Sequence, residues 1–243
     1  MSTIDAPARP VRYLEIDSLR GLAALAVVLY HFHMMWKTDA PSVSPSPFLR
    51  SLSSLAAPVG LEAVILFFVL SGFVLSLPAV SGKPQRYLTF VVRRVFRIYV
   101  PYLAALAVSV AGAFWLHGPV THSGWFNKSW SEPVNWHLVG QHLLFLGVYD
   151  RSQFENPIWS LIHEMRISLV FPFLCAAVLR LRNRWGLVSA LGLTVAAILL
   201  ERKPFLVDSF QADSAHYAAF FILGILVARN RDILSLHFSQ AHC

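Results

Sequence analysis

The stretch "DSLRGLAALAVVLYHFHMMW", residues 17–36, has the length and composition of a helix that crosses a membrane. Such a helix needs about 20 consecutive, predominantly apolar residues. Within it, however, Arg20 lies near the start, and His31 and His33 lie near the end. Ionisable side chains are costly inside a membrane and often mark a functional site. This segment therefore predicts a membrane protein and singles out its first helix as a candidate for function.

The rest of the chain extends this prediction to several spans. Of its 243 residues, 56% are hydrophobic and 14% are charged, and the mean hydropathy is +0.56. A weaker apolar segment at 136–149 is expected to lie at the membrane surface or to dip into it rather than cross. We predict an all-α fold, a polytopic transmembrane helical bundle in which residues 1–243 form a single domain. Its six expected spans lie near residues 19–36, 59–80, 98–116, 157–179, 185–200 and 215–228.

The basic residues predict the orientation of these spans. The segment "SGKPQRYLTFVVRRVFRIY", residues 81–99, joins the second span to the third and is basic without any acid. Because such segments stay on the cytoplasmic side, we expect it and both termini to be cytoplasmic. Anchoring of this kind also accounts for the net charge of +7, so no nucleic-acid partner is expected. Residues 42–47 are expected to form an outer loop. An outer interfacial belt is predicted at Trp115, Trp125, Trp130 and Trp136.

Arg20 and His31 are predicted to share one face of the first helix. Eleven residues make about three helical turns, so the two lie about 16 Å apart along the axis. His33 is rotated by roughly 200° and points elsewhere. Each residue also has an ordinary interpretation: Arg20 as a snorkelling, topology-setting residue, and His31 as an interfacial or hydrogen-bonded core residue.

Four motifs follow one another along the chain. "YLEIDSLRGLAALAVVLYHF" (13–32) holds an arginine, ten residues and a histidine, and "ILFFVLSGFVLS" (65–76) holds Phe-Phe-x-x-Ser-Gly-Phe. "RRVFRIYVPY" (93–102) is basic at the entry to the third span, and "NPIWSLIHEMRISLVFP" (156–172) holds Trp-Ser-Leu-x-x-Glu before Phe-Pro. Together they resemble the signature of the acyltransferase-3 family of bacterial membrane acyltransferases.

The chain also departs from that pattern. The family often has a second acid where Met165 follows Glu164, and an acid where Ile65 stands, although Glu62 lies about one turn earlier. Members of the family are usually longer and have more spans. The resemblance therefore implies a truncated or partial member, incomplete at the C-terminus.

The resemblance implies that an acyl group, commonly acetyl, passes from acetyl-CoA or another acyl-CoA to a hydroxyl of a cell-surface carbohydrate or glycolipid. It places the protein in the lipid bilayer of the bacterial inner (plasma) membrane, and no metal is expected. CoA is polyanionic, and guanidinium groups bind phosphate well. The expected donor-binding residues are Arg20, Arg93, Arg94 and Arg97, for which positive-inside anchoring is the alternative.

Acyl transfer to an alcohol needs a base for the hydroxyl proton or a nucleophile that carries the acyl group. Histidine can do either near neutral pH, so His31 is the catalytic candidate. A carboxylate is expected to orient it, and the sequence leaves open whether Glu62 or Glu164 does so. Glu164 has a structural alternative, an ion pair with Arg166 or with an arginine on another helix.

Three further residues are expected to contact substrate. Trp159 and Ser160 begin the fourth span at the predicted outer surface, where an aromatic ring stacks on a sugar or simply anchors the helix. Ser71 belongs to the Ser-Gly step of the second span, which also permits close helix approach. His163 faces roughly 100° away from Glu164 and is left out of the core set.

Two other functions compete with acyl transfer. Intramembrane His and Glu residues also build proton relays, so a proton-coupled transporter is the main alternative. Such carriers have internal repeats, which the sequence does not show. An inactive, truncated acyltransferase remnant is the second alternative.

Overall fold

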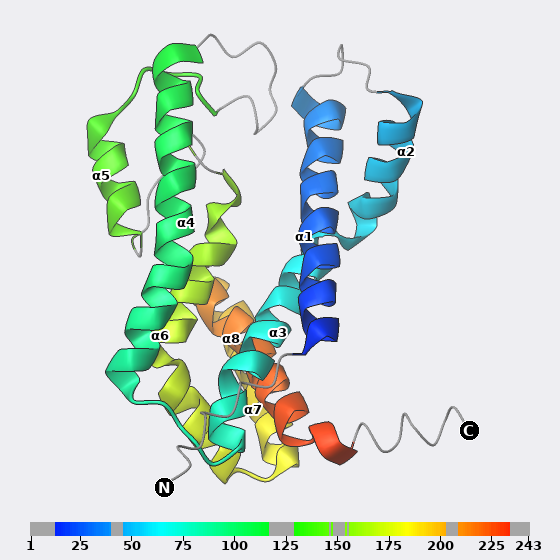
Figure 1. Ribbon diagram of the computed structural model, residues 1–243, viewed down its shortest axis with the longest axis vertical. Coiled ribbons are helices and arrows are strands. Elements are labelled where there is room, and N and C mark those ends of the chain that lie inside the picture. Colours follow the sequence, from blue (N-terminus) through cyan, green and yellow to red (C-terminus); the bar gives the residue numbers. More distant parts are fainter. Residues whose placement is uncertain are drawn as a thin grey trace, which may run out of the picture.

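The computed structural model describes residues 13–39, 46–116, 129–145, 147, 154, 156–202 and 209–233. Within these ranges the regular secondary structure is entirely helical, so the all-α prediction is confirmed. Figure 1 shows the helices as an open bundle in which α1 and α2 lie on one side and α4, α5 and α6 on the other.

Within the described residues, six helices are long and apolar enough to cross a membrane, and they match the six predicted spans. They are α1 (Leu14–Met34), α3 (Gly60–Val80), α4 (Tyr87–Leu116), α6 (Trp159–Arg180), α7 (Asn183–Glu201) and α8 (Ser209–Arg229). The third span differs most, because α4 begins at Tyr87 rather than near residue 98. Hydropathy marks the arginines as a boundary, but arginine is a good helix former, and one of them is buried inside the bundle.

Two shorter α-helices in the described part of the chain lie beside these spans. Helix α5 (Trp136–Leu144) has nine residues, too few to cross a bilayer, as predicted for this region. Helix α2 (Pro47–Ala56) was not predicted: the side chain of Ser46 accepts from the Leu49 amide, and Pro47 occupies the first turn. A serine cap followed by proline is a recognised helix start. Of the predicted loop 42–47, residues 42–45 lie outside the described residues.

The core is built around the crossing of α3 and α8, which pack together most extensively of all helix pairs. A Cβ atom at Gly72 would collide with the backbone of Phe221, and one at Gly224 would lie 2.5 Å from the amide nitrogen of Phe73. The two glycines therefore permit backbone contact between the helices. Aromatic and aliphatic side chains fill the space around this crossing, among them Phe68, Phe171, Phe221, Ile222 and Ile225.

Many large apolar side chains point outward instead. Leu22, Val108 and Phe173 are examples, each at least 65% exposed. A soluble protein rarely shows so much apolar surface, whereas a bundle in lipid requires it. Of the predicted aromatic belt, Trp115 and Trp136 are exposed, Trp130 donates to Ser109 inside the bundle, and Trp125 lies outside the described residues.

Seven of the described basic residues gather at one end of the bundle, the lower end in Figure 1. Here α1 begins, α3 turns into α4, α6 turns into α7, and α8 ends. We call this the basic end and the other the opposite end. Its basic residues are Lys83, Arg86, Arg180, Arg182, Arg184, Arg229 and Arg231.

Candidate functional site

His31 lines a cavity of about 320 Å³ where α3 and α6 begin, away from the basic end. Helices α1, α3 and α6 form it, so three segments that are distant in the sequence meet here. The cavity brings together His31, Trp159 and Ser160, the predicted base and two predicted substrate contacts. The full lining is Val27, Tyr30, His31, Gly60, Leu61, Val64, Pro157, Trp159 and Ser160.

A backbone carbonyl orients the imidazole of His31. Its Nδ1 lies 2.7 Å from the carbonyl oxygen of Val27, one turn earlier in α1. Because a carbonyl can only accept, Nδ1 is the protonated nitrogen, and in the neutral ring the basic lone pair lies on Nε2. Sequence reasoning considered only carboxylates for this role and missed the carbonyl, which the helix itself supplies.

Gly60 shapes the wall of this cavity. A Cβ atom at this position would collide with the ring of Tyr30. The absence of a side chain therefore lets Tyr30 pack against the start of α3, directly beside His31. Glu62, the other predicted catalytic acid, is exposed in the first turn of α3 and is not among the residues that line the cavity.

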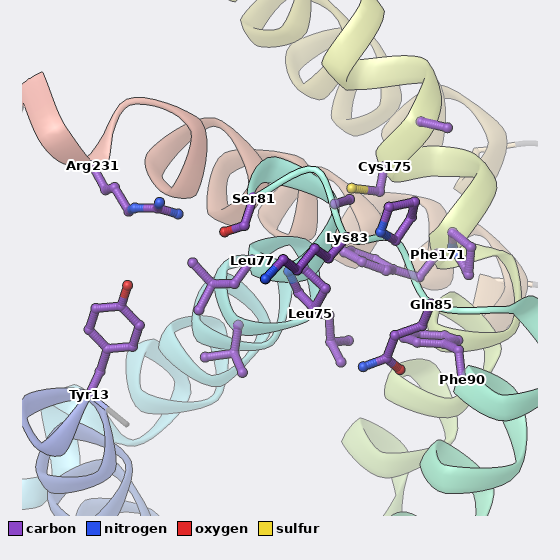
Figure 2. Close-up of a pocket in the computed structure, with 16 residues that line it drawn as sticks. Tyr13, Leu75, Leu77, Ser81, Lys83, Gln85, Phe90, Phe171, Cys175 and Arg231 are labelled. Carbon is purple, nitrogen blue, oxygen red and sulfur yellow. The ribbon is translucent and has the colours of Figure 1, made fainter. Parts of the chain in front are cut away.

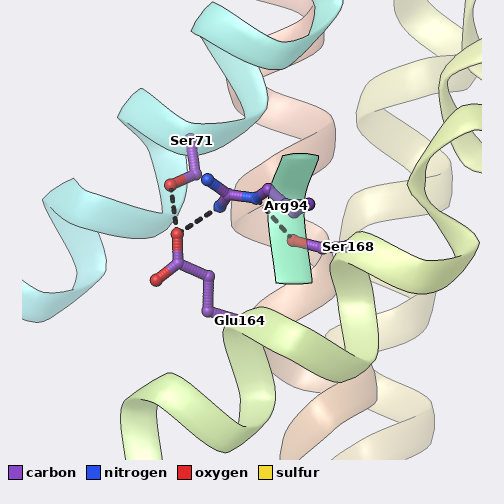
Figure 3. Close-up of polar contacts among 4 residues, drawn as sticks. All are labelled: Ser71, Arg94, Glu164 and Ser168. Carbon is purple, nitrogen blue, oxygen red and sulfur yellow. Dashed lines mark hydrogen bonds and ion pairs between the residues drawn. The ribbon is translucent and has the colours of Figure 1, made fainter. Parts of the chain in front are cut away.

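Glu164 is the centre of a polar network between three helices (Figure 3). Its Oε1 accepts from Nη2 of Arg94 in α4, and from Oγ of Ser71 in α3 at 3.0 Å. Nε of Arg94 donates to Oγ of Ser168, one turn along α6, also at 3.0 Å. The side chains of Arg94 and Glu164 are 8% and 21% exposed. Glu164 thus forms the interhelical ion pair that the sequence had left as its structural alternative.

Two members of this network were predicted to bind substrates. Arg94 was predicted to bind the acyl donor, but its guanidinium is buried and already holds Glu164 and Ser168. Ser71 was predicted to contact substrate, and its hydroxyl donates to Glu164. The Ser71-Gly72 step contributes to helix packing in the two ways expected from the sequence. Gly72 permits close approach of α8, and Ser71 donates a hydrogen bond to α6.

The remaining predicted arginines lie around this network. Arg20 is 3.8 Å from the carboxylate of Asp17, and the charges of Arg97, Arg94 and Glu164 act on it across the bundle. Arg93 and Arg97 are both exposed on α4. The structure therefore groups Arg20, Arg94 and Arg97 near Glu164.

Arg20 and His31 lie on the packed face of α1, as the helical period predicts. That face runs through Arg20, Ala23, Val27 and His31 at steps of three and four residues. Ala23 is buried, and Val27 and His31 line the cavity.

His163 is buried behind Trp159 and was left out of the predicted site. Its Nδ1 lies 2.8 Å from Oγ of Ser214 in α8. Its ring contacts Trp159 and Tyr217, with centroids 6.1 and 5.0 Å away. Tyr217 of α8 also contacts Trp159 directly, with ring centroids 5.5 Å apart, so α8 packs against both residues. Helical spacing shows only that His163 and Glu164 point apart, so no signal in the sequence pairs His163 with α8.

Comparisons with known proteins agree with this architecture. A family model described as an acyltransferase domain matches residues 13–240. Acyltransferase MdmB from Streptomyces mycarofaciens is 29% identical over 209 residues, which cover 86% of this chain and 50% of that protein. The chain thus spans about half the length of this curated relative. No solved structure matches the chain. The family model covers nearly all residues of the chain, and the four sequence motifs predicted the same family. The protein therefore belongs to the acyltransferase-3 family.

Proposed function

We propose that the protein transfers an acyl group from acyl-CoA to a hydroxyl of a cell-surface carbohydrate or glycolipid, with His31 as the general base. The observation that carries this proposal is the His31 cavity, in which an oriented imidazole meets Trp159 and Ser160. Its volume of about 320 Å³ lies at the lower end of the range of small-molecule sites, about 300–1,000 Å³.

The chemistry follows from the tautomer of His31. Nε2 takes the proton of the acceptor hydroxyl while the oxygen attacks the carbonyl carbon of the thioester. The C–S bond then breaks, the ester forms, and the proton on Nε2 passes to the departing CoA sulfur. The Val27 carbonyl holds the ring in position and stabilises the imidazolium that forms transiently. Trp159 offers a flat apolar surface on which a sugar ring can stack.

The arginines and Glu164 have supporting roles in this proposal. Glu164 is a positioning residue, because its ion pair with Arg94 joins α4 to α6 one turn below Ser160. Arg20 and Arg97 add positive charge between the basic end and His31. Along α1, Arg20 and His31 are about 16 Å apart. The basic end is proposed to face the cytoplasm, where acyl-CoA is made.

Replacing His31 tests the proposal. Membranes containing the protein are supplied with radiolabelled acetyl-CoA, and both free CoA thiol and label in the glycan and glycolipid fractions are measured. We expect His31→Asn to lower transfer by about 100-fold or more, in the range that general-base catalysis contributes, about 10²–10⁴. His33→Asn is the matched control, because His33 lies on the same helix and is not among the residues that line the cavity.

The controls separate the competing functions. Transfer by the His31→Asn protein at the rate of the unmodified chain would refute the proposed base. Movement of a solute across the membrane without release of CoA thiol would indicate a carrier instead.

A further inference from the structure

A second and larger cavity lies at the basic end of the bundle (Figure 2). Its volume is about 760 Å³. The end of α3, the turn into α4 and the lower half of α6 form its walls, and Tyr13 and Arg231 close one side. The cavity is separate from the His31 site, and no residue lines both.

The mouth of this cavity is cationic and rich in hydrogen-bond donors. In Figure 2 the ends of Arg231, Lys83 and Tyr13 point toward a common space, with the hydroxyl of Ser81 at its rim. None of the described residues that line the cavity is acidic. Guanidinium, ammonium and phenol donors around one space are suited to phosphate oxygens, which only accept.

Arg231 has unused capacity to bind an anion. Its Nη1 is buried and has no hydrogen-bond partner among the described residues. Its Nε lies 3.5 Å from the carboxylate of Asp232, which is the neighbouring residue and is 86% exposed. A buried donor that lacks a partner is unfavourable, so an oxygen ligand in this cavity would be stabilised by satisfying it.

The inner wall is apolar. It consists chiefly of Leu75, Phe90, Phe171, Pro172 and Cys175. Phe90 and Phe171 stack with their centroids 6.1 Å apart. A ligand that fills the cavity therefore combines an anionic head with an apolar or amphipathic arm.

The inner end of the cavity lies close to the Arg94–Glu164 network. Phe90 lies one turn before Arg94 in α4, and Phe171 lies about one turn after Ser168 in α6. The apolar wall thus ends at the Arg94–Glu164 network. On the other side of that network, Ser160 lines the His31 cavity one turn before Glu164.

We propose that the cavity at the basic end binds a phosphate-bearing amphiphile, with its phosphate between Arg231, Lys83 and Tyr13 and its arm along the apolar wall. Two kinds of molecule share this chemistry. One is acyl-CoA, with nucleotide phosphates and a pantetheine arm. The other is an anionic phospholipid, with a phosphate headgroup and acyl chains.

Binding to the purified full-length chain in a non-ionic detergent distinguishes these sources. One arm measures acetyl-CoA by titration calorimetry, and the other measures phosphatidylglycerol against phosphatidylcholine by native mass spectrometry. The test variant combines Lys83→Gln with Arg231→Gln. The matched control combines Arg180→Gln with Arg182→Gln, which removes the same charge from exposed positions at the same end and outside the cavity.

We expect one of the two phosphate probes to bind at least tenfold more weakly to the test variant and less than twofold more weakly to the control. A large effect on acetyl-CoA would assign the cavity to the donor, and a large effect on phosphatidylglycerol alone would assign it to lipid. Equal weakening by both variants would show nonspecific attraction and overturn the proposal. Unchanged binding by the test variant, or failure of both probes to bind, would also overturn it.

A labelling experiment tests the same site without removing its cations. In a Cys175→Ser and Cys243→Ser background, the thiol introduced by Ser81→Cys lies at the rim of the cavity, and the thiol introduced by Thr89→Cys is exposed outside it. The bound probe should slow maleimide modification at least threefold at the first position and leave the second unchanged. Equal rates at position 81 with and without the probe would contradict binding in this cavity.

The result is distinguishable from a failure of the proposed function. Loss of binding in the test variant does not depend on catalysis, and His31→Asn should bind the probe normally. If His31→Asn transferred acyl groups at full rate while the cavity bound its probe, the base would be wrong and the binding site would stand.

Discussion

At the scale of single residues, a backbone carbonyl orients His31, and a buried ion pair occupies Glu164. His31 is oriented by the carbonyl of Val27, so the site does not require a carboxylate to select its tautomer. Glu164 is committed to Arg94 and Ser71 through one oxygen. This arrangement favours a histidine that works in the cavity and a carboxylate that holds the surrounding helices.

The ion pair makes a prediction at this scale. Removing one member leaves a buried charge unpaired, which costs about 3–5 kcal/mol, whereas replacing both with apolar residues is often close to neutral. Glu164→Leu should therefore lower the melting temperature in detergent more than the double variant Glu164→Leu with Arg94→Met. Ser71→Ala, which removes one hydrogen bond, should cost about 1 kcal/mol.

A double variant that melts no higher than Glu164→Leu alone would contradict a simple pair. It would show that Arg94 stabilises the fold through its contact with Ser168 or through packing.

At the scale of helices, the crossing of α3 and α8 holds the centre of the bundle together. Gly72 and Gly224 lie where each helix meets the backbone of the other. Close approach through small residues is a principal source of helix association in membranes, where lipid offers no hydrophobic driving force. Helix α8, held by this crossing, also contacts Trp159 through Tyr217.

Enlarging these glycines should separate the helices. Gly72→Ala and Gly224→Ala should each destabilise the protein by about 1–3 kcal/mol or more, as overpacking of a close-packed core does. Thermal unfolding in detergent, followed by circular dichroism, measures the change. Gly192→Ala is the matched control, since a Cβ atom there meets nothing within 4 Å. Equal melting temperatures for Gly72→Ala and Gly192→Ala would refute the backbone contact.

At the scale of the whole molecule, the asymmetry of charge separates the two ends. Basic residues from the α3–α4 turn, the α6–α7 turn and the end of α8 gather at the basic end, whereas the His31 cavity lies where α3 and α6 begin, away from that end. Positive segments are retained in the cytoplasm. The proposed acceptor hydroxyl would therefore meet His31 from the outer side.

Thiol labelling of intact cells checks this orientation. In a Cys175→Ser and Cys243→Ser background, an impermeant maleimide should modify Trp136→Cys, an exposed position on α5, and should modify Arg86→Cys only after the cells are permeabilised. The reverse pattern would place the basic end outside and would move the proposed donor side with it.

The membrane helices were predictable because the length and hydropathy of each span depend only on the residues of that span. The six spans were found, and so were the common face of Arg20 and His31 and the short, non-spanning character of α5. These features depend on neighbours within one helix. The helix start at Ser46-Pro47 is also a local signal, although the sequence analysis did not predict it.

What lies between helices was decided by the tertiary structure alone. Each of the main contacts joins residues that are far apart in the chain. His31 meets Trp159 and Ser160, and Glu164 pairs with Arg94. Helix α8 contacts Trp159, and one cavity brings Lys83 and Arg231 together. The sequence by itself determined that this protein is a bundle of membrane helices carrying a histidine and several arginines. Which of these side chains meet depends on how the helices cross, and that is set by packing at close contacts such as Gly72 and Gly224, which no single helix contains.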